Sequence, residues 1–283
     1  MTYFVSFRSQ SVGGSVTSAT VWSGDGTISP LSLRPVENYM LGALVAGKNI
    51  LFATHGFNVS REAGACSLTQ LDQFLDLASS DIFFCVLWPG DFWLPVVNYP
   101  FEGGVSMHCG RLLADFCNRN LAAAQSLSFV SHSLGARLVL EAVKNLNRQA
   151  QSVCLTAAAI NQDCLMTEYA AAAGKAKSIS LLASRRDMVL GLAFPIGDPI
   201  ADFFNEDHKP FEPALGYAGP PLPTAPPVVA PWQIAKNADY GHGNYLPPGD
   251  SVTPKPVIPA EKWSAVAAFM ARAFRGQPQS WPS

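Results

Sequence analysis

Apolar runs that alternate with helix-like stretches constrain the fold of this chain more than any other feature. The runs at 49–54 (NILFAT) and 81–88 (DIFFCVLW) lack the polar–apolar alternation of a strand with one face in water. Apolar residues at helical spacing follow each run, over 61–79 and 105–120. Buried strands that are each followed by a helix indicate a mostly parallel central sheet with helices on both faces.

Shorter signals extend this pattern to both ends of the chain. They predict extended segments at 3–8 and 19–23, strands at 127–131, 152–160, 178–183 and 232–236, and helices at 134–147, 166–173 and 260–274. Two stretches interrupt the alternation: 89–104, which is rich in aromatic residues, and 210–231, which holds eight prolines. Proline at that density excludes a helix, and the residues that follow are too few for a second α/β domain. We therefore predict a single domain over 1–283, with a proline-rich excursion at about 205–231.

The composition excludes several classes of protein. Hydrophobic residues make up 48% of the 283 residues and charged residues only 14%, so the chain is not intrinsically disordered. A net charge of −2 without a basic run predicts no binding to nucleic acid. The sequence contains no run of about 18 apolar residues, and we expect no membrane span.

The cysteines and the first residues of the sequence predict a reducing compartment. Six cysteines are scattered without the paired spacing of a metal site, and the mixed cluster of His108, Cys109 and Cys117 also lacks that spacing. Residues 1–8 (MTYFVSFR) lack the basic start and the long apolar stretch of a signal peptide. We therefore predict a cytoplasmic protein with reduced thiols, without a metal or another cofactor.

A candidate nucleophile lies between a predicted strand and a predicted helix, in residues 131–135 (SHSLG). A serine on such a tight turn projects its hydroxyl from the edge of the sheet, and the following helix directs free N–H groups to the same point. Strand and helix nearly touch there, so the residues two before and two after the serine must be small. Ser131 and Gly135 meet this requirement, which favours Ser133 as a nucleophile over an ordinary helix N-cap.

A serine hydroxyl needs a base, and the base needs an acid that orients it. On a sheet of this kind the chain order is serine, acid and histidine, each on a loop after a strand. Asp187 follows a predicted strand, and His242 lies between two glycines beyond the last one, so that successive members are 54 and 55 residues apart. Asp163 and Asp202 are alternative acids, and His208 is an alternative base.

Acyl transfer also needs hydrogen-bond donors for the oxyanion, commonly two backbone N–H groups. Leu134, directly after the candidate nucleophile, is expected to supply one of them. The loop after the NILFAT strand is expected to supply the other through Phe57, with Asn58 as the alternative. We expect His55 in that loop to be a structural hydrogen-bonding residue, and His132 to pack in the fold rather than act as the base.

These strings together resemble a known family. Residues 55–58 (HGFN), 131–138 (SHSLGARL), 184–190 (SRRDMVL) and 241–243 (GHG), with Trp88-Pro89 after a strand, are similar to those of an uncharacterised bacterial group of α/β-hydrolases described as serine esterases. The resemblance covers about residues 48–245. It implies an α/β-hydrolase fold with Ser133 as nucleophile, Asp187 as acid and His242 as base. Ser131 departs from the glycine that is usual at its position.

We therefore expect a carboxylesterase that acts on a small-molecule ester through an acyl-enzyme. The same three residues can also serve an amidase, a peptidase or a thioesterase, and a hydrolase-fold binding protein without turnover is a further alternative. The interval 152–183 has no insertion large enough for a cap domain, which favours an open site. Trp88, Phe92 and Trp93 are candidate substrate contacts. The aromatic residues of 89–104 can instead pack that segment onto the body of the protein or form a lipid-facing lid.

Overall fold

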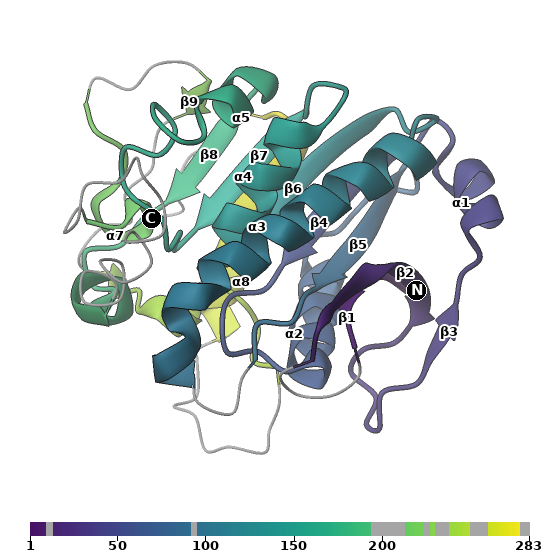
Figure 1. The fold of residues 1–283 in the computed structure, drawn as a ribbon, viewed down its shortest axis with the longest axis horizontal. Helices are drawn as coiled ribbons and strands as arrows, with labels where there is room; N and C mark the ends of the chain where they lie inside the picture. Colours follow the sequence, from purple (N-terminus) through teal and green to yellow (C-terminus); the bar gives the residue numbers. More distant parts are fainter. Residues whose placement is uncertain are drawn as a thin grey trace.

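The computed structural model describes residues 1–9, 14–91, 95–193, 213–222, 227–229, 238–249 and 260–277. Within these ranges nine strands form one sheet in the order β3-β2-β1-β5-β4-β6-β7-β8-β9 (Figure 1). The strands are β1 (Thr2–Arg8), β2 (Val16–Gly24), β3 (Leu33–Pro35), β4 (Asn49–Thr54), β5 (Asp81–Leu87), β6 (Ser126–His132), β7 (Ser152–Thr156), β8 (Ile179–Leu182) and β9 (Val228–Val229). Neighbouring strands are parallel from β1 across to β9, whereas β2 pairs antiparallel with β1 and β3. The predicted mostly parallel sheet is confirmed.

Helices cover both faces of the sheet, as the sequence predicts. α3 (Pro95–Asn120) and α4 (Gly135–Asn145) lie together on one face, and α2 (Arg61–Phe74) and α8 (Ala260–Phe274) lie on the other (Figure 1). The shorter elements are α1 (Asn38–Val45), α5 (Ala170–Lys175), α7 (Leu215–Ala218), a π-helix η1 (Val189–Ala193) and a 3₁₀ turn η3 (His242–Asn244). None of the helices in the described ranges is both long and apolar enough to cross a lipid bilayer.

The central strands bury side chains on both faces, which explains why their sequences do not alternate. Phe52 on β4 stacks between Phe84 on β5 and Phe129 on β6, with ring centroids 5.4 and 5.3 Å apart. Every residue of β7 and β8 is buried. Buried apolar side chains from the sheet and its covering helices belong to one continuous core.

Most predicted elements lie where the sequence placed them, and β4 and α8 have the predicted bounds. The interpretation of 89–104 as an irregular segment was wrong from residue 95 onward, because α3 begins there. Proline is well tolerated in the first turn of a helix, but the proline and glycine content of 95–104 hid the helical signal. The short α1 and β3 were not predicted. The predicted strand at 232–236 lies outside the described residues. The proline-rich stretch contains β9 and the short helix α7, so the expectation that it holds no helix was wrong at 215–218, where no proline interrupts the chain between Pro213 and Pro220.

Candidate active site

Ser133 lies on the turn between β6 and α4 with a backbone φ of 55°, in the left-handed region that non-glycine residues rarely adopt. Three backbone hydrogen bonds hold this conformation. The Ser133 N–H donates to Thr156 O at 3.1 Å, and the Ser133 carbonyl accepts from Ala136 N at 3.0 Å and from Ala159 N at 3.2 Å. The candidate nucleophile therefore occupies a strained strand-to-helix turn that its neighbours fix in place.

The loop after β4 packs directly against this turn. A Cβ atom on Gly56 would lie 2.8 Å from Ser133 Cβ and 3.3 Å from Ser133 Oγ. A Cβ atom on Gly135 would lie 2.6 Å from the carbonyl oxygen of His55 and 2.8 Å from Thr54 Cγ2. These close approaches are the physical reason why glycine stands at both positions.

We expect Gly135→Ala to lower the free energy of unfolding by about 2 kcal/mol, because its new methyl group would overpack against the His55 carbonyl. The same displacement should lower kcat about tenfold, since small shifts in reacting geometry have large effects on rate. Gly174 of α5 is the matched control, because a Cβ atom there would meet nothing within 4 Å. Urea unfolding of both variants checks this prediction, and equal stabilities for the two would contradict it.

His242 lies on η3, and its ring connects Ser133 to an acid. Its Nε2 is 2.8 Å from Ser133 Oγ. Its Nδ1 is 2.8 Å from Asp187 Oδ2. A carboxylate can only accept, so Nδ1 carries the hydrogen and Nε2 is left to accept the Ser133 hydroxyl proton. The His242 side chain is 19% exposed, whereas the Asp187 side chain has no exposed surface. The imidazole is therefore the member of this pair that solvent can reach.

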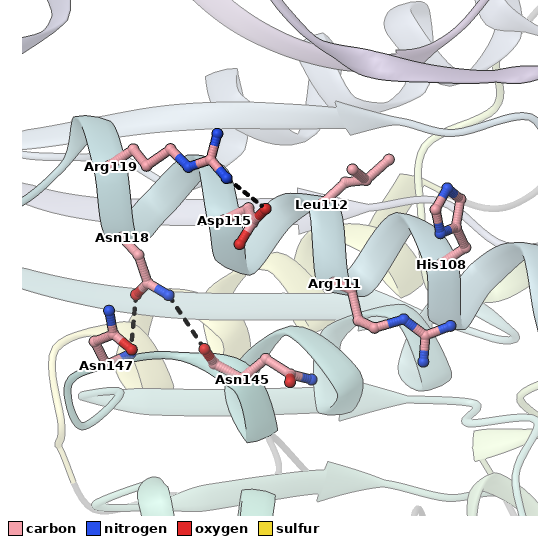
Figure 2. Close-up of a pocket in the computed structure, with 8 residues that line it drawn as sticks. All are labelled: His108, Arg111, Leu112, Asp115, Asn118, Arg119, Asn145 and Asn147. Atoms are coloured by element: carbon pink, nitrogen blue, oxygen red, sulfur yellow. Dashed lines mark hydrogen bonds and ion pairs between the residues drawn. The ribbon is translucent and has the colours of Figure 1, made fainter.

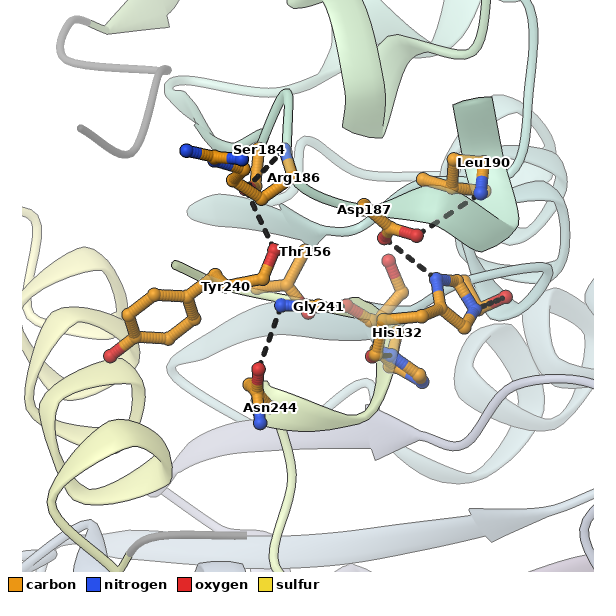
Figure 3. Close-up of polar contacts among 12 residues, drawn as sticks. His132, Thr156, Ser184, Arg186, Asp187, Leu190, Tyr240, Gly241 and Asn244 are labelled. Carbon is orange, nitrogen blue, oxygen red and sulfur yellow. Dashed lines mark hydrogen bonds and ion pairs between the residues drawn. The ribbon is translucent and has the colours of Figure 1, made fainter. Parts of the chain in front are cut away.

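Asp187 lies on the turn after β8 and its side chain has no exposed surface. Its Oδ1 accepts the backbone N–H of Leu190 at 3.0 Å (Figure 3). Its Oδ2 contacts the His242 ring. Both carboxylate oxygens therefore have a donor, which compensates the burial of the charge. The structure brings Ser133, His242 and Asp187 into one hydrogen-bonded chain.

Ser184 joins the loop of the acid to the loop of the histidine, a role that the sequence analysis missed. Its Oγ donates to Tyr240 O at 2.8 Å and accepts from Arg186 N at 3.1 Å (Figure 3). A buried serine at the start of a turn, two residues before an arginine N–H, is typical of a side chain that closes the turn on itself. The local contact with Arg186 N could have been predicted from the sequence. The contact with Tyr240 O, 56 residues further along the chain, could not.

His132 lies beside the candidate nucleophile but faces a different partner. Its Nε2 is 2.8 Å from His242 O, so the ring holds the backbone of the histidine loop. Burial, with a smaller contribution from the nearby His242, lowers the pKa of His132 to about 3, although the hydrogen bond to His242 O acts to raise it. A neutral, buried ring bound to a backbone carbonyl is a structural group rather than the base.

His55 is also buried and held by backbone and ring contacts. Its Nδ1 donates to Gly56 O at 2.8 Å, which leaves Nε2 as an acceptor for the Trp88 backbone N–H at 3.4 Å. The ring stacks on the Trp88 indole with centroids 5.6 Å apart. Burial lowers the pKa of His55 to about 4. This geometry is that of the structural hydrogen-bonding residue that the sequence analysis expected.

These two buried histidines should make the fold sensitive to acid. Each is neutral in the folded protein down to a pKa of about 4 (His55) or 3 (His132), whereas the ordinary value is 6.5. Below pH 6.5 the unfolded chain therefore binds more protons than the folded chain, and stability falls as the pH is lowered toward these folded values. Each histidine contributes up to about 1.4 kcal/mol per pH unit in that window.

Urea unfolding at pH 7.5, 5.5 and 4.5 measures how the free energy of unfolding changes with pH. A comparison of the parent with His132→Gln isolates the histidine, because the carboxylates contribute equally to both proteins. His132→Gln keeps a donor near the Nε2 position but cannot titrate, so its slope should be shallower by up to one proton. An unchanged slope in this variant would show that His132 is not a buried neutral group.

The predicted oxyanion donors lie on the two segments that meet at the candidate nucleophile. Leu134 follows Ser133 at the N-cap position of α4, and Phe57 follows the glycine that packs on Ser133. The alternative donor, the Asn58 N–H, donates to Gly90 O at 2.6 Å and is already engaged. This contact argues against Asn58 as the donor.

Trp88 does not fit its predicted role as a substrate contact. Its side chain has no exposed surface, and its indole N–H donates to His55 O at 3.0 Å. A ring without accessible surface cannot line a pocket, so Trp88 supports the loop after β4 instead. The other two candidate contacts, Phe92 and Trp93, lie outside the described residues.

Of the alternative acids and base, the structure describes Asp163 alone. Asp163 lies on the segment after β7 and accepts a hydrogen bond at its carbonyl from Thr167 Oγ1 at 3.2 Å. Asp202 and His208 lie outside the described residues. Within the described residues, the hydrogen-bonded partner of the His242 ring on the acid side is Asp187.

The mixed cysteine and histidine cluster lies on α3. Cys109 and Cys117 are buried free thiols of α3. His108 instead faces a polar groove of about 620 Å³ between α3 and α4, beside Arg111 and Asp115 (Figure 2). Among the described residues, no group of three or more histidine, cysteine, aspartate and glutamate side chains could hold a metal ion.

The mostly parallel sheet, its two layers of helices and the strained serine after β6 define an α/β hydrolase. Residues 41–201 match the family described as alpha/beta hydrolase of unknown function (DUF900), and the chain belongs to this family. The matched region contains Phe57, Ser133 and Asp187 but ends before His242. A comparison with curated proteins found no match to this chain.

Proposed function

We propose that the protein is a serine hydrolase that cleaves carboxylic esters, with Ser133 as nucleophile, His242 as base and Asp187 as the orienting acid. One observation carries the proposal: the hydrogen-bonded chain from Asp187 Oδ2 through the His242 ring to Ser133 Oγ, with both contacts at 2.8 Å. A buried acid, a part-exposed imidazole and a strained serine in this order form the arrangement that activates a hydroxyl.

In the first half of the proposed reaction, His242 Nε2 takes the Ser133 hydroxyl proton as Oγ attacks the ester carbonyl carbon. The carbonyl oxygen becomes an oxyanion, which the N–H groups of Phe57 and Leu134 stabilise. The tetrahedral intermediate then collapses, the bond to the alkoxy oxygen breaks, and the protonated His242 donates its Nε2 proton to the leaving alcohol. The acyl group remains on Ser133 Oγ.

In the second half, a water molecule takes the position of the alcohol. His242 Nε2 accepts a proton from this water as its oxygen attacks the acyl carbon. Collapse of the second intermediate returns the proton to Ser133 Oγ and releases the carboxylic acid. Asp187 keeps the imidazole in the Nδ1–H form and stabilises the imidazolium that forms twice in each cycle. Side chains and backbone amides supply all of this chemistry, so the proposal needs no metal or other cofactor.

The connection between β7 and β8 supports an open site for small or medium-sized esters. All of it is described, and it carries only turns and the short α5 between Thr156 and Ile179. A cap domain of the kind that many hydrolases insert there is therefore absent from this connection. Activity should rise smoothly with substrate concentration, and a steep increase at a lipid–water interface would contradict this part of the proposal.

A panel of p-nitrophenyl esters of graded acyl length, with matched thioester and anilide analogues, tests the reaction class. We expect turnover of at least the short esters, with faster turnover of the ester than of its anilide. Preferred turnover of the anilide or thioester would replace the esterase proposal with an amidase or thioesterase. Binding of every ester without turnover would favour a binding protein and contradict the proposed catalysis.

A further inference from the structure

A buried ion pair at the carboxyl edge of the sheet takes no part in the proposed reaction. Arg8, the last residue of β1, contacts the Asp91 carboxylate through Nη2. The Arg8 and Asp91 side chains are only 1% and 7% exposed. Removing two charges from water costs free energy, which their mutual attraction offsets only when further hydrogen bonds satisfy the remaining polar atoms. The other contacts of Arg8 are therefore important.

Arg8 also binds two backbone carbonyls. Its Nη1 donates to Val59 O and to Trp88 O, both at 3.3 Å. In the sheet β1 is next to β5, and β5 is next to β4. The Arg8 side chain therefore reaches across the end of β5 to the 55–59 loop, which follows β4.

Direct contacts join the 55–59 loop to the 88–91 loop after β5. Asn58 N donates to Gly90 O at 2.6 Å. The Trp88 indole N–H donates to His55 O at 3.0 Å, and the Trp88 backbone N–H donates to His55 Nε2 at 3.4 Å. The two loops thus form one unit, and Arg8 and Asp91 bind this unit to the end of β1.

The proposed reaction requires this unit to be held in place. Leu134, one expected oxyanion donor, is fixed by the turn that carries Ser133. Phe57, the other, lies in the middle of the 55–59 loop, between the glycine that packs on Ser133 and the Asn58 contact. Two donors stabilise an oxyanion only when both lie within hydrogen-bond distance of its position.

We propose that Arg8, with Asp91, is a positioning residue that holds the 55–59 loop, and with it the Phe57 N–H, in register with Ser133. This inference rests on the proposed function. Loss of the Arg8–Asp91 pair removes stabilisation of the transition state but leaves the three reacting side chains in place. The value of kcat should therefore fall with little change in KM.

The double variant Arg8→Met/Asp91→Leu is the first test, because it removes both charges together and leaves no unpaired charge buried. We expect kcat for a p-nitrophenyl ester to fall about 10–100-fold. The rate ratio between an ester and its thionoester, which carries sulfur in place of the carbonyl oxygen, should fall as well. Sulfur is a weak hydrogen-bond acceptor, so loss of a donor harms the oxygen ester more.

Arg148→Met is the matched control. Arg148 also bridges two backbone carbonyls, Ala124 O and Gln125 O, both at 2.8 Å, but at the start of β6 rather than at its carboxyl end. This variant should keep both kcat and the ester-to-thionoester ratio. Arg8→Lys should recover part of the loss, because lysine keeps the charge but cannot make the same set of bonds.

Hydrogen–deuterium exchange provides a readout that does not depend on activity. In the double variant, amides of the 55–59 loop should exchange faster, while those of β6 keep their protection. Normal exchange together with an unchanged ester-to-thionoester ratio would overturn the positioning role. A parent protein that does not turn over any ester would overturn the proposed function, whatever the exchange shows. Faster exchange and a lower ratio together support both.

Discussion

Ser133→Ala should lower kcat for a p-nitrophenyl ester by about 10⁴–10⁶-fold, because it removes the atom that forms the acyl-enzyme. His242 and Asp187 would keep their mutual contact at 2.8 Å, so substrate binding should change little. The fold should survive, since the three hydrogen bonds that hold residue 133 in its left-handed conformation come from its backbone. Steady-state kinetics with circular dichroism of the same preparation checks both parts.

Ser131→Ala is the matched control for this substitution. Ser131 lies two residues earlier on β6, is fully buried, and its Oγ forms no hydrogen bond with the described residues. Removing a buried hydroxyl without a partner should be neutral or slightly stabilising. Activity retained in Ser131→Ala and lost in Ser133→Ala would assign the chemistry to one serine of the motif. Comparable activity in the two variants would refute the assignment of the nucleophile.

Asp187→Asn should lower kcat by about 10⁴-fold while leaving the fold close to the parent. Asparagine keeps an oxygen that can accept the Leu190 N–H, now at 3.0 Å from Asp187 Oδ1. Its amide NH₂ would then face His242 Nδ1 and act as a donor. That contact favours the ring with its hydrogen on Nε2, the form that cannot take the Ser133 proton.

Asp163→Asn separates this effect from a general loss of a carboxylate. Asp163 also follows a strand of the sheet, but its described contact is with Thr167 and not with His242. The variant should keep kcat within about twofold of the parent, as expected for a group outside the hydrogen-bonded chain. A large loss in Asp163→Asn with full activity in Asp187→Asn would exchange the roles of the two acids.

The sequence carried enough information to predict the sheet and the order of the three reacting residues. Strands without polar alternation reveal burial on both faces, and the small residues around Ser133 reveal the close approach of strand and helix. Asp187 could be found because it follows β8, and His242 because it lies between two glycines at the place in the chain order where the base is expected.

Other features depend on contacts that sequence spacing does not encode. Arg8 and Asp91 are 83 residues apart, and neither lies near a motif that points to the other. His132 looked like a packing residue, but its contact with the backbone of His242 depends on where a loop 110 residues later returns to the sheet. Trp88 follows a strand as many pocket residues do, and only the structure shows that its ring is buried.

A covalent label gives the most direct test of the proposed nucleophile. The full chain is incubated with a fluorophosphonate, digested, and its peptides are mapped by mass spectrometry. We expect one adduct per chain, on Ser133, and no adduct in Ser133→Ala, because only an activated serine displaces fluoride from phosphorus at an appreciable rate. A label on another residue, or an unlabelled parent protein that still hydrolyses esters, would contradict the central role of Ser133.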